Sequence, residues 1–410
     1  PCWELDTFNR DYRLPPVFDP TFVQANPRPT APDDVGGELK VASFNVLNYF
    51  VNLGEEGDVC GPNGGMECRG AYTPTEFGRQ QAKIVEAMCA IDADVFGLME
   101  LENPNPARDP KPTDGIDNYV LKSLVDALND PSSSCPEDTY YAFTDSGAMG
   151  TDAIRQGIIY NSNTVTPVGR AVLDDPDFTD PNDLGEQKSR PAIAETFEDA
   201  DGERFTVVVN HLKSKGSDCG GPPDDDPIQG NCNGTRTKGA AYLIDWLTTD
   251  PTGSGDPDFL VIGDINAYAM EDPIIEFLNA GYTDLLDKYQ GETAYTYIFD
   301  GLSGYLDHAL SNPPLLRQVT GATEWHTNAD EPPVIDYGEY YNPTGYYTDD
   351  AYRASDHDPV IVGLQLSPIP VGGVSIPLAL PAFLQPQVLL LVISLGLVMG
   401  LGLVLTRRTR

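Results

Sequence analysis

Short apolar segments recur along this chain, and several of them end in a polar residue that is able to do chemistry. Alternating segments rich in β-branched and aromatic residues are typical of buried strands, and apolar residues spaced three or four apart are typical of helices. The expected strands are residues 39–47, 94–101, 157–160, 193–197, 205–210, 259–262 and 360–366. The expected helices are residues 75–90, 119–128, 240–247 and 273–279. Because strands and helices interleave, the sequence predicts an α/β or α+β fold.

The polar residues that follow or adjoin these apolar runs are amides, carboxylates and imidazoles. They are Asn45, Glu100, Asn210, His211, Asp264, Asn266, Asp307, His308, Asp356, His357 and Asp358. A buried strand that ends in such a group places it on the rim of a sheet, where several strand ends converge on one cleft. Carboxylate and amide oxygens bind hard divalent cations, and imidazoles exchange protons near neutral pH. The pattern therefore predicts a cleft suited to a divalent cation and to in-line phosphoryl displacement.

Seven motifs stand at these positions in a fixed order. They are SFNVLNY, DVFGLMELEN, SRPA, VVNHLKSKG, GDINAY, YLDHAL and SDHDPV. In this order they resemble the endonuclease/exonuclease/phosphatase superfamily, and most of all its secreted bacterial nuclease branch. The resemblance covers residues 38–366, and it implies a four-layer sandwich of two packed mixed β-sheets flanked by helices.

The resemblance also implies a metal site. Asn45, Glu100 and Asp356 match the positions expected to bind a divalent metal ion, with Mg²⁺ expected first and Mn²⁺ or Ca²⁺ as alternatives. Glu102 is a nearby alternative to Glu100, but Glu100 better matches the position directly after the strand.

The catalytic residues implied by the resemblance lie in four of the motifs. Asp264 and Asn266 are expected to orient the attacking water and to stabilise the transition state. His211 is expected to hydrogen-bond a phosphate oxygen, with protonation of the leaving oxygen as a further role. Asp307 is expected to hold His357 in its reactive tautomer, so that His357 acts as a general base or a phosphate anchor.

Two arginines and one histidine complete the expected site. Arg190, in SRPA, and Arg155, in DAIRQGIIY, are expected to bind the substrate. His308 stands where the family commonly has a tyrosine, which leaves its role open. His326 follows no strand end and is expected at the surface.

The chain is strongly acidic, with 63 Asp and Glu against 25 Lys and Arg and a formal net charge of −38. This excludes a protein that holds nucleic acid by a broad basic surface. For a nuclease with this charge, three effects can relieve the repulsion of nucleic acid: a divalent cation in the cleft, a local basic rim, and salt that screens the remaining charge over a Debye length of about 8 Å. The residues expected to form the rim are Lys213, Lys215, Arg236 and Lys238. We therefore expect activity that tolerates or prefers raised salt.

The two ends of the chain differ from its body. Residues 1–37 contain seven prolines and are expected to hold the end of an upstream β domain and a linker. Residues 367–386 are expected to be a second linker, rich in Pro and Gly. In residues 387–410, an apolar run at 388–405 reaches roughly 27 Å as a helix, enough to cross a bilayer, and a basic end follows.

This C-terminal pattern resembles bacterial tripartite sorting tails, which implies a transmembrane anchor or release by a sorting protease. Positive charge beside an apolar span stays in the cytoplasm, so the body is expected outside the cell or on its surface. Oxidising compartments favour disulfides, and local spacing suggests three pairs among the seven cysteines. The pairs are Cys60–Cys68, Cys219–Cys232 and Cys89–Cys135, which leave Cys2 over. The acidic run 224–226 is expected to be a solvated loop, with Ca²⁺ binding as the alternative.

The sequence predicts a metal-dependent extracellular nuclease that hydrolyses phosphodiester bonds of DNA, with RNA as a further substrate. The alternatives with the same chemistry are a phospholipid phosphodiesterase of the sphingomyelinase kind and another phosphoesterase of the same fold, such as one that acts on a small phosphomonoester. The Tyr-rich segment 341–352 does not decide between nucleic acid and lipid. A non-catalytic surface adhesin is the alternative of another class. It is disfavoured because no candidate catalytic residue is missing.

Overall fold

A computed structural model describes residues 28–366 apart from 106–118, 184, 222–223, 341 and 343–344, together with two short N-terminal strands. These strands, β1 (Glu4–Leu5) and β2 (Tyr12–Arg13), pair antiparallel. The chain divides into the units 1–367 and 368–410. The predicted tail at 387–410 and the whole predicted linker at 367–386 lie outside the described residues. Among those that are described, no helix is long and apolar enough to span a bilayer.

One six-stranded sheet has the order β15-β16-β3-β4-β6-β5. Its strands are β3 (Leu39–Tyr49), β4 (Val95–Glu102), β5 (Tyr141–Phe143), β6 (Ile154–Asn161), β15 (Val319–Glu324) and β16 (Val360–Leu364). The β3–β4 pair is parallel and the other pairs are antiparallel, so the sheet is mixed.

A second six-stranded sheet has the order β11-β14-β10-β9-β8-β7. Its strands are β7 (Thr166–Leu173), β8 (Ala192–Glu198), β9 (Arg204–His211), β10 (Phe259–Asp264), β11 (Thr283–Asp284) and β14 (Asp307–Ser311). Here β9 and β10 are parallel and the other pairs are antiparallel. A separate hairpin is formed by β12 (Tyr297–Phe299) and β13 (Leu302–Gly304).

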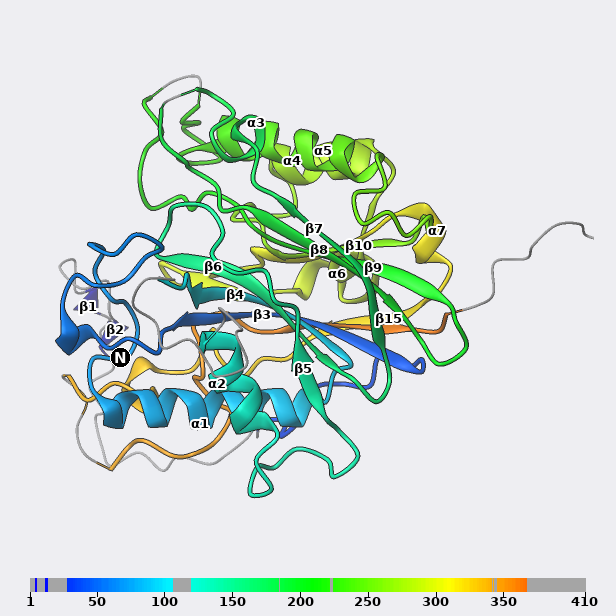
Figure 1. The fold of residues 1–410 in the computed structure, drawn as a ribbon. Helices are drawn as coiled ribbons and strands as arrows, with labels where there is room; N and C mark the ends of the chain where they lie inside the picture. The colour runs from blue at the N-terminus through cyan, green and yellow to red at the C-terminus, as the bar shows by residue number, and fades with distance from the viewer. Residues whose placement is uncertain are drawn as a thin grey trace, which may run out of the picture. The chain divides into compact units, whose positions relative to one another are not determined.

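Helices cover the outer faces of the two sheets, as Figure 1 shows, with α1 and α2 on one side and α3, α4 and α5 on the other. The helices are α1 (Pro74–Ile91), α2 (Tyr119–Leu128), α3 (Pro176–Thr179), α4 (Asn233–Leu247), α5 (Asp272–Asn279), α6 (Leu285–Tyr289) and α7 (Pro313–Leu316). Short 3₁₀ turns occur at Gly54–Glu56, Gly291–Thr293 and Pro333–Ile335.

The alternation of side chains along the strands builds the layers. On β9, Val207 and Val209 belong to the core between the sheets, whereas Val208 packs with Ala240 beneath α4. Successive residues of a strand face opposite sides, so one strand serves two cores. At Gly97 on β4, a Cβ atom would lie only 2.6 Å from Ile262 Cδ1, so the sheets approach closely there. The predicted sandwich of two mixed sheets flanked by helices is confirmed.

The sequence did not predict the edge strand β7. Pro167 and Gly169 interrupt its sequence, and most of its residues are exposed or half-buried. A strand at a sheet edge is solvated on one side, so its apolar alternation is weak and it tolerates proline. The pairing with β8 through Ala171 and Leu173, a tertiary contact, stabilises it.

Candidate active site

The candidate functional side chains lie where strands of both sheets end. In the second sheet, Asp264 of β10 pairs with His211 of β9 on one side and with Asp307 of β14 on the other. In the first sheet, Asn45 of β3 and Glu100 of β4 lie near the ends of the parallel pair. The two rims therefore carry the polar residues that the sequence places at strand ends.

Local irregularities of the backbone direct these side chains. The register shifts in β3 after Asn45 and in β4 between Leu98 and Leu101, and Glu100 has a left-handed φ of 62°. A bulge of this kind turns a side chain out of the regular alternation, and such strain is found often at functional sites. Gly263 has a φ of 129°, and a Cβ there would lie 2.0 Å from Asn210 O, so only glycine fits before Asp264.

Asn45 joins the two sheets. Its Nδ2 lies 3.3 Å from Glu100 Oε1 and 3.5 Å from Asp264 Oδ2, although Asp264 belongs to the other sheet. Glu100 Oε2 accepts a hydrogen bond from the backbone N–H of Asn48 at 3.1 Å. Burial raises the pKa of Glu100, and the negative charge of half-buried Asp356 raises it further. Asn45, Glu100, Asp264 and Asp356 thus form one acidic cluster.

His357 is held by a buried carboxylate. Its Nδ1 lies 2.7 Å from Asp307 Oδ2, which also accepts a hydrogen bond of 2.7 Å from Thr296 Oγ1. Its Nε2 lies 3.9 Å from Asp264 Oδ2, so this nitrogen faces the acidic cluster. Burial lowers the pKa of His357, but Asp307, Asp264 and Asp356 raise it, and the net pKa is well above the ordinary value.

His211 lies near the same Asp264 oxygen as His357. Its Nε2 lies 3.5 Å from Asp264 Oδ2, and its buried Nδ1 has no hydrogen-bond partner among the residues described. Burial, together with the positive charge of Arg190, lowers the pKa of His211 well below its ordinary value. A neutral imidazole with an unpaired buried nitrogen is suited to hydrogen-bond an incoming oxygen.

Two arginines meet at Asp152 beside His211. Asp152 Oδ2 accepts a hydrogen bond from Arg190 Nε at 2.9 Å, and Asp152 Oδ1 lies 3.4 Å from Arg69 Nη2. Arg190 Nη1 also donates to Leu212 O at 3.3 Å. Both arginines help to lower the pKa of His211, so their charges act on the site. Sequence reasoning missed Arg69 and Asp152, and the one available signal was that Arg69 directly follows a predicted disulfide.

Asn266 follows Asp264 in a left-handed turn with a φ of 54°. Its backbone N–H donates to Asp264 Oδ1 at 2.8 Å, and its Nδ2 donates to Leu212 O at 3.1 Å. The turn therefore fixes the Asp264 carboxylate and brings the Asn266 amide to the same rim.

Arg155 and Glu102 lie in a supporting position instead. Arg155 is fully buried, and it donates from Nη1 to Ser146 Oγ at 2.7 Å and from Nε to Glu102 O at 3.4 Å. Glu102 Oε2 accepts hydrogen bonds from the backbone N–H groups of Val51 and Asn52, at 2.8 and 3.1 Å. Of the two neighbouring glutamates, Glu100 is therefore the one joined to Asn45. The contact of Arg155 with substrate stays a prediction.

His308 and Asp358 also stabilise structure. His308 Nδ1 lies 3.0 Å from Asp284 Oδ2, and its Nε2 lies 2.8 Å from Ala267 O. Asp358 Oδ2 lies 3.0 Å from Nδ1 of His326, which is partly exposed, in keeping with its expected surface position. These bonds give His308 a role in the fold next to the site.

The predicted basic rim is largely absent. Lys215 is paired with Glu271, and Arg236 is buried and donates to Lys213 O and Asn231 O. Arg236 satisfies loop carbonyls instead of facing solvent. Half-buried Lys213 lies near the site, because its charge acts on His211, and Arg236 lies near it too, because the charge of Asp264 acts on Arg236. Exposed Lys238 donates a hydrogen bond to Asn182 Oδ1.

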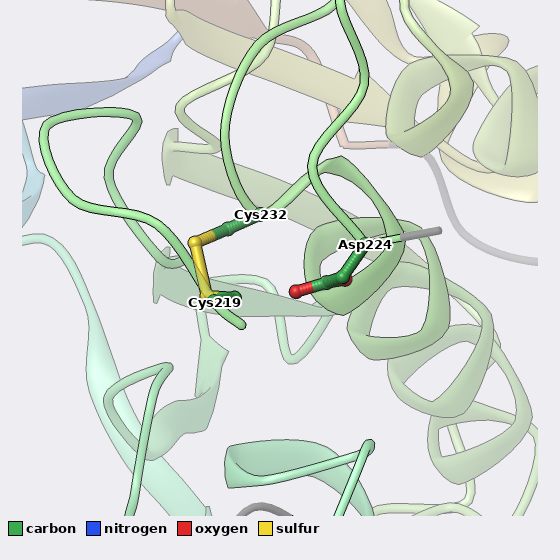
Figure 2. A group of neighbouring side chains, drawn as sticks. All are labelled: Cys219, Asp224 and Cys232. Carbon is green, nitrogen blue, oxygen red and sulfur yellow. A yellow bond between two sulfur atoms is a disulfide. The ribbon is translucent and has the colours of Figure 1, made fainter. Parts of the chain in front are cut away.

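All three predicted disulfides are present: Cys60–Cys68, Cys89–Cys135 and Cys219–Cys232. Figure 2 shows Asp224 beside the Cys219–Cys232 pair, with donor atoms close enough to one another for a metal ion. The sulfur atoms are bonded to each other, however, and Asp224 Oδ2 accepts a hydrogen bond from Thr235 Oγ1 at 3.0 Å. These three residues therefore stabilise the loop before α4. In the same acidic run, Asp226 accepts hydrogen bonds from two backbone N–H groups, which shape the loop.

The acidic cluster fits a hard divalent cation. Its potential oxygen donors are the carboxylates of Glu100 and Asp356, with Asp264 alongside. The amide oxygen of Asn45 accepts a hydrogen bond from Leu47 N at 3.1 Å, and Asn45 Nδ2 faces Glu100 and Asp264, so ligation by Asn45 requires its amide to turn over. Burial raises the pKa of Asp264, and Asp307 and Glu100 raise it further. Several carboxylates crowded in a buried place are stabilised by a cation with oxygen preference.

Comparison with known proteins gives a family and a fold. The family model described as endonuclease/exonuclease/phosphatase family matches residues 42–357. No curated protein matches the chain. A mannosyl-6-phosphatase from Bacteroides thetaiotaomicron has 16% identity and a TM-score of 0.49, covering 80% of this chain and all of its own. The human Nocturnin catalytic domain has 15% identity and a TM-score of 0.45, covering 79% of this chain and 92% of its own.

A third similar structure is TDP2 from D. rerio in complex with a single-strand DNA product. It has 14% identity and a TM-score of 0.42, covering 79% of this chain and 97% of its own. Members of the matched family are typically hydrolases that act on phosphoester bonds and generally use divalent metal ions. Because the family model spans most of the chain and every motif of the cluster, this chain belongs to the endonuclease/exonuclease/phosphatase family.

Proposed function

We propose that this protein is a metal-dependent extracellular nuclease, with DNA as its first substrate and RNA as a further one. The observation that carries the proposal is the position of the Arg69–Asp152–Arg190 group beside His211 and the acidic cluster. Paired guanidinium groups bind phosphate oxygens, and the neighbouring carboxylates suit a divalent cation. The combination supports hydrolysis of a phosphodiester bond despite the negative charge of the whole chain.

The residues divide the chemistry between them. Asn45, Glu100 and Asp356 would hold the metal ion, with Mg²⁺ proposed ahead of Mn²⁺ and Ca²⁺. When bound, such an ion polarises a phosphoryl oxygen and stabilises the leaving oxyanion. Arg190 and Arg69 orient the phosphate, because Asp152 fixes the directions of both guanidinium groups.

The water and the protons are handled on the second sheet. Asp264 and Asn266 orient the attacking water at the rim, where the Asn266 backbone fixes the carboxylate. His211 Nδ1 meets a phosphate oxygen, which satisfies a nitrogen that is otherwise buried without a partner among the described residues. His357 presents Nε2 to the cluster because Asp307 occupies Nδ1. This division of roles has the same logic as a hydrolase triad.

The extracellular location is part of the proposal. Three disulfides support it, because such bonds persist in oxidising compartments. An anchor at residues 387–410, retained or removed by a sorting protease, is proposed from the sequence pattern. The high acidity of the chain is in keeping with a saline environment.

A second candidate function is hydrolysis of a phospholipid diester. The hairpin of β12 and β13 exposes Phe299 by 58% and Leu302 by 75%, and Tyr297 of the same hairpin stacks on His357 with ring centroids 4.6 Å apart. The sequence analysis did not single out this apolar tip. Exposed apolar residues so near the site favour contact with a lipid surface. The adhesin alternative remains disfavoured, because most of the candidate catalytic residues lie together.

One assay tests these functions against each other. The purified protein is incubated with plasmid DNA, RNA, sphingomyelin vesicles and a chromogenic phosphodiester, each with Mg²⁺ and with EDTA. We expect EDTA-sensitive cleavage of DNA, with RNA cut more slowly and sphingomyelin intact. Cleavage of sphingomyelin alone would replace the nuclease proposal with the lipid one, and no hydrolysis of any substrate would favour the adhesin.

A further inference from the structure

A cavity of about 750 Å³ opens between the loop before α1 and the loop at residues 336–340. Its walls combine aromatic rings with carboxylates. The residues that provide them are Tyr72, Glu76, Asp336, Tyr337, Glu339 and Tyr340. No aliphatic side chain larger than that of threonine is among its lining residues. Aromatic rings and carboxylates without large aliphatic side chains are typical of a pocket that binds a polar, planar group. Such a lining does not suit an acyl chain.

The cavity lies beside the acidic cluster. Gly70, in its wall, is packed so closely on Asn48 that a Cβ would lie 2.0 Å from Asn48 O. The backbone N–H of Asn48 in turn donates to Glu100 Oε2. Tyr337, in the opposite wall, is close enough to Asp356 and Glu100 for their charges to help burial raise the pKa of its phenol. Both walls of the cavity therefore border the cluster.

Its walls are fixed in relation to each other. Glu76, in the first turn of α1, accepts a hydrogen bond of 2.7 Å from Tyr72 N with one oxygen and one of 2.7 Å from Glu339 N with the other. Asp336 Oδ1 accepts from Gly338 N at 2.7 Å, which shapes the second wall. Because these hydrogen bonds already order both walls, the cavity loses little conformational entropy when it binds a ligand.

The tyrosine rings and the carboxylates of the cavity indicate which chemical group it can bind. Tyr340 is 78% exposed and Tyr72 is 60% exposed, so a planar group can reach both rings from solvent, that of Tyr72 on the side away from Gly54. Planar bases stack on such rings without regard to sequence. The carboxylates of Glu76, Asp336 and Glu339 repel a phosphate group, but they do not repel an uncharged ring.

We propose that this cavity is a subsite for one unpaired nucleobase of the nucleic acid, adjacent to the phosphate that is cleaved. The inference rests on the proposed nuclease function and adds a substrate class to it. A base in a duplex is stacked and paired, so the subsite favours single-stranded nucleic acid or a base that has left the stack.

The test uses a single-stranded DNA oligonucleotide in which one phosphodiester is cleavable and the others are phosphorothioates. In a matching series, a tetrahydrofuran residue replaces one nucleotide at a time, which removes the base and keeps the backbone. The full chain and its variants are assayed with Mg²⁺ on each oligonucleotide and on methyl p-nitrophenyl phosphate, which has no base.

For the unmodified protein we expect kcat/KM to fall roughly tenfold when the base is removed at one position near the cleavable bond, because one stacked base is lost. Tyr340→Ala and Tyr72→Ala should show the same loss on the intact oligonucleotide and no further loss on the abasic one. Tyr340→Phe keeps the ring and should behave as the unmodified protein. Tyr140→Ala is the matched control, because Tyr140 is 59% exposed and does not line the cavity.

Three outcomes would overturn the inference while the nuclease proposal stands: equal rates on all abasic oligonucleotides, alanine variants that cut the intact oligonucleotide normally, or alanine variants that lose the same factor with and without the base. The last outcome would indicate a contact with sugar or backbone. If the unmodified protein hydrolyses methyl p-nitrophenyl phosphate but no oligonucleotide, both proposals are wrong. Circular dichroism melting curves confirm that each variant is folded.

Discussion

Asp307 Oδ2 lies 2.7 Å from His357 Nδ1, and this bond connects the two sheets of the sandwich. Asp307 begins β14 in the second sheet, whereas His357 lies three residues before β16 in the first. Asn45 and Asp264 form a second link across the same seam, at 3.5 Å. The geometry of the site therefore depends on how the sheets pack, and neither sheet carries the site by itself.

Replacing Asp307 by Asn should lower kcat by roughly a thousandfold, because the amide no longer stabilises the charged imidazole or fixes its tautomer. His357→Ala and Asp264→Ala should abolish hydrolysis. Thr296→Val removes the hydroxyl that donates to Asp307 Oδ2 and accepts from the backbone N–H groups of Asp307 and Leu306, but it keeps the carboxylate and should cost much less. Steady-state kinetics on a phosphodiester measure these losses, and melting temperatures show whether the variants fold. Near-normal turnover of the Asp307 variant would contradict the assignment.

Removal of the metal should abolish activity, and Glu100→Gln should weaken Mn²⁺ binding by on the order of tenfold or more, since a carboxylate ligand becomes a neutral amide. Titration calorimetry measures the affinity. Glu102→Gln is the matched control, because Glu102 accepts backbone hydrogen bonds from Val51 and Asn52. We expect it to lower the melting temperature and to leave Mn²⁺ affinity unchanged. The reverse result would exchange the roles of the two glutamates.

Asp152→Asn should raise KM on the order of tenfold while kcat changes less, because charge-assisted hydrogen bonds to Arg190 and Arg69 are weakened. The two guanidinium groups are then less fixed in the free enzyme, and ordering them on substrate binding lowers the affinity. Asp126→Asn, which loses an exposed ion pair with Lys122, controls for the general effect of charge. A loss confined to kcat would place Asp152 in the chemical step instead.

His308 should stabilise the fold in a defined pH window. The Asp284 carboxylate outweighs the effect of burial and raises the pKa of His308, and the same pairing lowers that of Asp284. A raised histidine pKa contributes stability that is complete below the unfolded value and is lost as pH rises through the folded one. A lowered aspartate pKa contributes stability above its unfolded value.

The His308–Asp284 contribution is therefore greatest between the unfolded pKa values, about 3.9 and 6.5. The melting temperature of His308→Asn should fall furthest below that of the unmodified protein near pH 5 to 6. The difference should shrink toward pH 9. A difference that is constant across this range would show that the pair is not ionised.

Activity should persist or rise as salt is increased to that of seawater. With a net charge of −38, the chain repels a nucleic acid at long range, and salt screens this repulsion. Initial rates on DNA at fixed Mg²⁺ test the expectation. A tenfold fall between very low ionic strength and seawater strength would contradict it, and would indicate that attraction by cations such as Lys213 dominates.

Much of the site could be predicted from strand ends. Asn45, Glu100, His211 and Asp264 each stand at or near the end of a buried apolar segment, and the apolar pattern of such segments is visible locally. Arg69 and Asp152 could not be found in this way. Both residues lie in loops, and they are 83 residues apart in the chain although they contact each other. No local sequence pattern predicts such a contact.

The directions in which side chains point could also not be predicted from the sequence. Asp307 and His308 are neighbours, and both have side chains that could act in an active site. Asp307 faces His357, however, whereas His308 faces Asp284. Successive residues of a strand point to opposite sides, and which side is the cleft is decided by the packing of the sheets.

The sequence by itself determined which segments are buried strands and which residues end them, because burial and alternation are local properties. The order of its seven motifs indicated a phosphoesterase fold by resemblance. Only the tertiary structure decided that Glu100 turns into the cluster through a bulge, that Arg155 and Arg236 are buried, and that a cavity lined with tyrosines borders the site. Those outcomes depend on contacts between segments far apart in the chain, whose free energies are set by the packing of the two sheets and their loops.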